Sequence, residues 1–378
     1  MGQLGTGILF AVFAACSTWL IHKISFHYHR RGPKTESGTI EIGYYEVFSL
    51  LLILLVVFFC VFRTIDVDSG GTDAYVYQTQ FAQSTGSLFE QLTRFEGWEP
   101  LHAVSLWIVR CVTEEYRVYL VLYYILMALF LIKYAKMIKL DRKWLLATFA
   151  LMLLFLNSFN TQRNTFAVFA SLFVLDALLK KKHIRAAIYV LVITGFHFSA
   201  LIWFVVIGAS VFIRFFRGSM KRKLIGYMIV SSAASLAGLR LFPILAGDHR
   251  LAFYINAGSS LSIPMLFTFL FVFIVFLLYY RMIVDKSDGD DTVMLSILYL
   301  SFAPMFVLQM QYSILYRMML YSIPVLYIVL AKYKEVFSKG GSRVSYVYIA
   351  CNLVYLLRIA LFYRDFADLG NYSSVLLR

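Results

Sequence analysis

The chain is 378 residues long, 61% hydrophobic and 15% charged, with a formal net charge of +14 and a mean hydropathy of +0.74. A soluble globular domain has about 25% charged residues, so this composition excludes an ordinary soluble protein. Apolar runs of roughly 18–22 residues are long enough to cross a bilayer and unlike the short alternating strands of an outer-membrane barrel. The sequence predicts an all-α, polytopic integral membrane protein with a single membrane domain over residues 1–378.

Long apolar runs predict membrane spans along the whole chain. In chain order these spans cover 5–22, 43–63, 117–137, 143–159, 164–179, 221–239, 263–284, 293–312, 317–331 and 344–362. Together with the irregular segments described below, they amount to roughly 10–12 transmembrane helices.

Connections rich in lysine and arginine set the expected orientation, because short basic connections stay in the cytoplasm. These connections are 23–34, 133–143, 180–185, 214–223 and 332–343. The segment 64–116, the loop 240–262 and both chain termini are then expected on the outer, periplasmic face.

Two segments do not fit a simple series of crossings. Residues 100–112 are too short to span and are predicted to form a shallow helix at the outer face. Residues 186–213 join two basic connections, so they must enter the membrane and return as a broken, re-entrant hairpin. Gly195 is the expected break, which places His197 near a cavity that opens outward.

The two kinds of basic residue are predicted to separate across the membrane. Every basic residue expected outside is an arginine, whereas every lysine falls on the cytoplasmic side. Arginine has a planar fork that can bind phosphate with two hydrogen bonds. The outer arginines are Arg63, Arg94, Arg110, Arg117, Arg163, Arg240, Arg250, Arg317, Arg358, Arg364 and Arg378. The positive charge inside reflects orientation and does not indicate nucleic-acid binding.

Arg163 lies in the stretch "SFNTQRNTFAVFASL", between two apolar runs and with no acidic residue near it in the sequence. One interpretation is an arginine that extends to the membrane interface as an anchor. The other is an anion site, since Arg163 is predicted near the start of a helix, where free N–H groups favour negative charge. The neighbouring amides Asn160, Gln162 and Asn164 favour the second interpretation, because amides line polar cavities.

Acidic and aromatic residues follow the second predicted span. Asp66 and Asp68 could form a metal site, or they could belong to an ordinary acidic loop. Asp73, followed by Tyr75 and Tyr77, better fits a sugar contact, with the carboxylate for hydroxyl groups and a ring for an apolar sugar face.

Glu99 and His197 each have a structural and a functional interpretation. Glu99 precedes Pro100, so it can simply begin a helix and complement the helix dipole. His197 can be a histidine that is satisfied within the core, although its place at a helix break favours a role in chemistry. His197, Asp73 and Glu99 are the candidates for a general base.

Four segments support a family resemblance: "FRTIDVDSGGTDAYVY", "EPLHAVSLWIV", "QRNTFAVFASL" and "GFHFSALIWF". Over residues 60–205 the chain resembles the EpsG-like branch of the Wzy polysaccharide polymerases. The C-terminal half is similar in general style, best in "LYRMMLYSIPVLYIV". The motifs of the resemblance fall on Asp73, Glu99, Arg163 and His197.

The resemblance implies a glycosyltransferase of the bacterial inner membrane. Its members join undecaprenyl-diphosphate-linked oligosaccharide repeats into O-antigen, capsule or exopolysaccharide at the periplasmic face. The substrate-binding residues expected here are Arg163, Arg250, Arg317, Arg240, Gln162 and Tyr77. No metal or cofactor is expected, because arginines can stabilise the charge of a diphosphate leaving group. The expected partners are the two lipid-linked glycans, the bilayer and a chain-length regulator protein.

Other functions stay open from the sequence. A lipid-linked glycan ligase would use the same chemistry on a different acceptor. A lipid-linked oligosaccharide flippase or another transporter would need a polar path through the bundle, often with internal repeats, and no repeat is visible.

Overall fold

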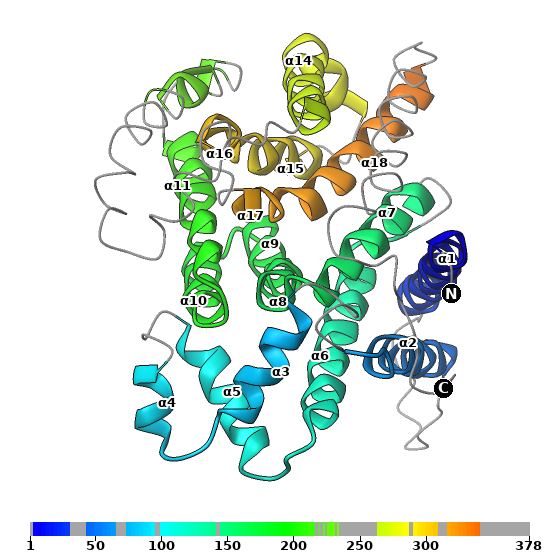
Figure 1. Ribbon diagram of the computed structural model, residues 1–378. Helices are drawn as coiled ribbons and strands as arrows, with labels where there is room; N and C mark the ends of the chain where they lie inside the picture. The colour runs from blue at the N-terminus through cyan, green and yellow to red at the C-terminus, as the bar shows by residue number, and fades with distance from the viewer. Residues whose placement is uncertain are drawn as a thin grey trace, which may run out of the picture. The chain divides into compact units, whose positions relative to one another are not determined.

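The computed structural model describes residues 3–30, 43–65, 73–94, 99–140, 144–215, 219, 222–223, 225–230, 233, 263–286, 290–308 and 316–340. Within these residues every regular secondary-structure element is a helix and none is a strand, which confirms the all-α prediction (Figure 1). The predicted span 344–362 and the predicted loop 240–262 lie outside the described residues.

Three of the described helices are long and apolar enough to cross a membrane. They are α1 (Gln3–Arg30), α2 (Tyr44–Val61) and α6 (Tyr116–Met137). The spans predicted at 43–63 and 117–137 are confirmed as helices.

The helix that contains the first predicted span, 5–22, is longer than that span. The helix α1 continues past Lys23 to Arg30, and the Lys23 ammonium lies 5.7 Å from the centre of the Trp19 ring. Basic side chains in its last turn also complement the negative end of the helix dipole.

Two predicted spans are not single α-helices. The helix α7 (Leu145–Phe155) continues as the 3₁₀ helix η2 (Leu156–Phe159), and the next segment divides into α8 (Gln162–Ala170) and α9 (Leu172–Leu179). At the division the Ser171 hydroxyl donates to the Val168 carbonyl at 2.6 Å. The predicted span 164–179 thus consists of two short helices that are separated at Ser171.

The chain forms two compact units. In the described residues, the first unit contains 3–172 and 192–198, and the second contains 173–191 and 199–340. Each unit is described by itself.

The second unit contains α11 (Ile202–Phe215), α14 (Ile263–Lys286), α15 (Asp290–Leu300), α16 (Ala303–Leu308), α17 (Tyr316–Met319) and α18 (Ser322–Gly340). The helix α15 packs against α14 and α18. The predicted span 293–312 is interrupted between α15 and α16, just before Pro304, which has no backbone N–H to continue the hydrogen bonds of the preceding helix. The predicted span 317–331 is likewise divided between α17 and α18.

In the first unit, the predicted outer segment 64–116 contains α3 (Ala74–Ala82), α4 (Leu88–Arg94) and α5 (Pro100–Arg110). The helix predicted at 100–112 is confirmed, with its end at Arg110. The helices α3 and α5 pack beside the N-terminal half of α6 (Figure 1). Phe81 of α3, for example, has its ring centre 5.5 Å from that of Tyr116.

A helix break lies at the predicted Gly195. The helix α10 (His183–Thr194) ends directly before it, and a 3₁₀ turn, η3 (Phe198–Leu201), follows before α11 begins. The re-entrant path of this segment through a membrane stays a prediction.

Candidate active site

The start of α5 is fixed to the break after α10. Pro100 occupies the first turn of α5, and the next two backbone N–H groups, of Leu101 and His102, donate to the Gly195 carbonyl at 2.8 Å and 3.2 Å. The first N–H groups of a helix have no partner within the helix, so this one carbonyl satisfies two of them. The contact holds together two segments that are almost a hundred residues apart in sequence.

Gly195 is a glycine because of this close approach. A Cβ atom at this position would lie 2.6 Å from Cγ and 2.8 Å from Cδ1 of Leu101. Any larger residue would push α5 away from the break. The position of Glu99 relative to His197 therefore depends on the absence of a side chain at residue 195.

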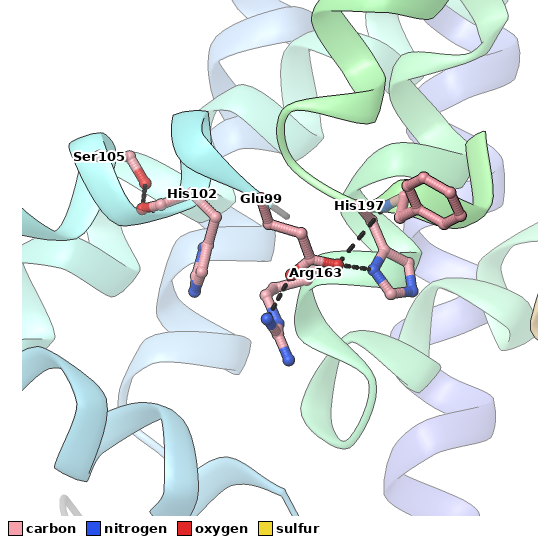
Figure 2. A network of polar contacts seen from close by, with 6 residues as sticks. Glu99, His102, Ser105, Arg163 and His197 are labelled. Atoms are coloured by element: carbon pink, nitrogen blue, oxygen red, sulfur yellow. Dashed lines mark hydrogen bonds and ion pairs between the residues drawn. The ribbon is translucent and has the colours of Figure 1, made fainter. Parts of the chain in front are cut away.

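The Glu99 carboxylate joins Arg163 and His197 (Figure 2). Its Oε2 accepts a hydrogen bond from Nη1 of Arg163, and its Oε1 contacts Nδ1 of His197. The backbone N–H of Phe198 also points to Oε1, at 3.4 Å. The three side chains come from the start of α5, the first turn of α8 and the break after α10, and they form one charged network.

The electrostatics of this network keep Glu99 ionised. Burial would raise the pKa of Glu99, but the hydrogen bond and charge of His197 and the charge of Arg163 lower it to about 2. A carboxylate that holds its charge so strongly is a poor acceptor for a substrate proton. Glu99 is thus suited to orienting its neighbours, and less suited to the role of general base.

The ionised carboxylate also determines the tautomer of His197. A carboxylate only accepts hydrogen bonds, so Nδ1 must carry the proton that it donates to Glu99. In the neutral imidazole the lone pair then belongs to Nε2. A histidine held by a carboxylate in this tautomer has the arrangement that general bases use in hydrolytic triads.

Arg163 also contacts the ring of Tyr77, and Gln162, the residue before it, is held by hydrogen bonds to α6. Its guanidinium carbon lies 5.5 Å from the centre of the Tyr77 ring. Gln162 is fixed by two tyrosines of α6: Tyr116 donates to its side-chain oxygen at 3.0 Å, and Tyr123 donates to its carbonyl at 2.7 Å. The first turn of α8 is therefore held in place against α6.

The structure places some of the predicted site residues together and others apart. Glu99, Arg163 and His197 contact one another, and Gln162 and Tyr77 support Arg163. The backbone N–H of Asp73 donates to Oδ1 of Asn160 at 3.0 Å, which places Asp73 near the turn before α8. Arg317 belongs to the second unit, and the remaining candidates, Arg240, Arg250, Asp66 and Asp68, lie outside the described residues.

The structure adds contacts to two of the predicted residues. Arg163 has an acidic partner, Glu99, which lies 64 positions earlier in the chain and so is not visible as a local pair. Tyr77 is only 5% exposed and its ring lies against Arg163, and its role in sugar binding stays a prediction.

His102 is a site residue that the sequence analysis did not identify. It is 4% exposed, and its ring centre lies 6.3 Å from that of Tyr77. Burial and the charge of Arg163 lower the pKa of His102 to about 3, so this imidazole is neutral at physiological pH. The available signal was its spacing: Glu99 and His102 are three positions apart at the start of a helix, where residues at that spacing are neighbours.

The described residues contain no group of three or more His, Cys, Asp or Glu side chains placed to hold a metal ion.

Comparison with known proteins identifies one family. The model of the EpsG family matches residues 46–375. No curated protein matches the chain, and no solved structure matches it.

Proposed function

Because the chain belongs to the EpsG family of Wzy-like polysaccharide polymerase-type proteins, we propose that it joins undecaprenyl-diphosphate-linked oligosaccharide repeats at the periplasmic face of the bacterial inner membrane. The single observation that supports this reaction is the network of Glu99, Arg163 and His197. It combines a cation for a leaving diphosphate with an oriented imidazole for an attacking hydroxyl.

The proposed reaction is a glycosyl transfer between two lipid-linked glycans. A sugar hydroxyl of the incoming repeat attacks the anomeric carbon of the growing chain. As that oxygen–carbon bond forms, the bond from the anomeric carbon to the diphosphate oxygen breaks, and undecaprenyl diphosphate leaves with the electron pair. The hydroxyl proton moves to Nε2 of His197, which acts as general base.

Arg163 stabilises the charge that develops on the leaving diphosphate. One of its Nη groups binds Glu99 and the guanidinium also interacts with Tyr77, whereas Nε has no hydrogen-bond partner and remains for a substrate oxygen. Fixed donors directed at developing charge supply a large part of many rate enhancements. Glu99 holds both side chains in the required geometry, so its role is positioning.

The same contacts also hold α5, α8 and the break together, so a purely structural role has to be separated from a catalytic one. The conservative variant Arg163→Lys and the variant His197→Gln retain polar side chains of similar reach. We expect both proteins to accumulate in the membrane at normal levels and to be severely impaired in chain growth.

The glycan profile of a strain that lacks this protein tests the proposal. Loss of a polymerase leaves single repeats on the final acceptor, and complementation with the intact chain restores long glycans. Loss of a ligase would leave no repeat on that acceptor, and loss of a flippase would leave lipid-linked repeats on the cytoplasmic side. Either of these two outcomes would contradict the proposal.

A further inference from the structure

A partly open pocket of about 220 Å³ lies next to the charged network, within the first unit. It is bounded by α5, α6 and α8 and by Phe196 at the helix break. Its walls are formed by His102, Ser105, Ile108, Val109, Tyr119, Leu122, Tyr123, Leu126, Gln162, Arg163, Phe166 and Phe196. Pockets that enclose a whole small ligand usually measure about 300–1,000 Å³, so this pocket fits one part of a larger molecule.

Three nitrogen atoms of pocket residues are buried and have no hydrogen-bond partner: Nε2 of His102, Nε2 of Gln162 and Nε of Arg163. His102 is 4% exposed and Gln162 only 1%. Buried polar groups in proteins almost always have a partner, and leaving one unsatisfied costs about 1–3 kcal/mol. Side chains around the pocket now cover these three nitrogens, so a ligand oxygen reaches them only when those side chains shift, and the guanidinium among them favours an anionic ligand group.

The opposite side of the pocket is apolar and reaches the surface of the unit. Ile108 of α5 and Leu122 and Leu126 of α6 line the pocket and are each about half exposed. The helix α6 is long and apolar enough to span a membrane, and exposed leucines on such a helix are suited to contact with lipid chains. The pocket thus connects the three nitrogens with a surface in contact with lipid chains.

We infer that this pocket binds the head-proximal part of the polyprenyl diphosphate carrier, which enters sideways from the bilayer between α5 and α6. The phosphate oxygens contact His102, Gln162 and Arg163, and the first isoprene units lie along Ile108, Leu122 and Leu126. This inference rests on the proposed function. It adds the place where the carrier binds, the direction from which the carrier enters, and two further phosphate-binding residues, His102 of α5 and Gln162 of α8. Neutral His102 gives a hydrogen bond without added charge, which leaves Arg163 as the cation.

Photo-crosslinking on α6 tests the location. A benzophenone amino acid is placed at Leu126 or at Leu129 of the full chain in nanodiscs, and radiolabelled undecaprenyl diphosphate is the probe. Both leucines are 43% exposed on the same helix, but only Leu126 lines the pocket. We expect a crosslink at 126 that excess unlabelled undecaprenyl diphosphate abolishes, and at least about a tenfold weaker one at 129. Equal crosslinking at the two positions, or equal competition by phosphatidylglycerol, would show ordinary boundary lipid and overturn the inference.

Substitutions in the pocket give a second measurement. Leu126→Trp, which fills the pocket, and His102→Ala, which removes a proposed phosphate contact, should each weaken binding of undecaprenyl diphosphate by about tenfold or more, whereas Leu129→Trp should leave it unchanged. Unaltered binding in both pocket variants would overturn the inference.

Binding is measured without turnover, so the two proposals can fail separately. Specific crosslinking by a chain that forms no polymer would contradict the proposed function alone. Polymer formation without a crosslink at 126 would contradict the pocket assignment alone.

Discussion

The first unit contains two arginine–glutamate pairs whose glutamates differ in burial, so the pairs can be compared residue by residue. Glu99 is mostly buried and binds Arg163 and His197, whereas Glu114 is 88% exposed and pairs with Arg110 at 3.1 Å on the same short segment. Exposed ion pairs contribute about 0–1 kcal/mol to stability, but removing one partner of a buried pair leaves an uncompensated charge. Only the first pair is therefore expected to matter for structure and activity.

Replacing Glu99 by Gln keeps the shape of the side chain and removes its charge. Arg163 then loses its counter-ion, and His197 loses the acceptor that fixes its tautomer. We expect chain growth to fall by about a hundredfold or more, in the range that general-base catalysis supplies. The assay is polymer formation by membranes with matched amounts of protein, and Glu114→Gln is the control. A similar, small loss in both variants would show that the Glu99 network has no special role.

The pH dependence of stability follows from the lowered pKa of Glu99. Its folded-state pKa is about 2, below the ordinary value of 4.5, so its contribution is complete above pH 4.5 and is lost as the pH falls toward 2. The unfolding temperature of the purified wild-type protein should exceed that of Glu99→Gln near neutral pH. The difference should shrink steadily between pH 5 and pH 3. A difference that stays constant over this range would mean that Glu99 is not ionised within the network.

At the scale of elements, the docking of α5 on the break after α10 brings the site together. The helix contributes Glu99 just before its first turn and His102 within it, and the break contributes His197. The Gly195 carbonyl joins the two segments through the first N–H groups of α5. A small change at this junction should disturb the site without removing any of its charged groups.

Gly195→Ala makes that change. The new methyl group would overlap Leu101, and such overpacking typically costs about 1–3 kcal/mol. We expect the variant to reach the membrane with strongly reduced polymer formation. Gly208→Ala in α11 is the control, because a Cβ there meets nothing within 4 Å and alanine is the better helix former. Normal activity of Gly195→Ala would show that the junction tolerates displacement.

The elements show which features a sequence reveals by itself. Long apolar runs identified α2 and α6, because span length follows from bilayer thickness. The division at Ser171 was missed because no glycine or proline marks it, whereas the division after α15 is marked in the sequence by Pro304 and was overlooked. The helices α3 and α4 were missed because they are short and their sequences lack a long apolar run.

Most residues of the candidate site could be predicted from the sequence, but their contacts with one another could not. Arg163 and His197 stood out as polar residues in apolar surroundings, which a single sequence displays. Glu99 contacts both of them, but it lies 64 positions from Arg163 and 98 positions from His197 in the sequence. Only the folded chain brings the three residues into contact. His102 was overlooked because its importance comes from the pocket it faces.

At the scale of the whole molecule, the lysines and basic connections predict the orientation in the membrane. An even number of crossings with cytoplasmic basic connections places both chain termini outside. A reporter that is active only in the cytoplasm should therefore be silent when fused after Arg378 and active when fused after Lys182. A strong signal from the fusion at Arg378 would overturn the proposed topology and with it the periplasmic location of the site.

If Arg163 binds the departing diphosphate while Glu99 and His197 prepare the attack, the rate of carrier release depends on the guanidinium of Arg163. Purified protein is supplied with an undecaprenyl-diphosphate-linked repeat, and the release of undecaprenyl diphosphate is followed together with chain growth. Lysine keeps the charge of Arg163 but lacks its fork, so Arg163→Lys should release the carrier about a hundredfold more slowly or worse, with Arg163→Ala slower still. Arg117→Lys, at an exposed arginine of the same unit, should match the wild type. Wild-type rates from Arg163→Lys at equal protein amounts would contradict the account and show Arg163 to be an interfacial anchor.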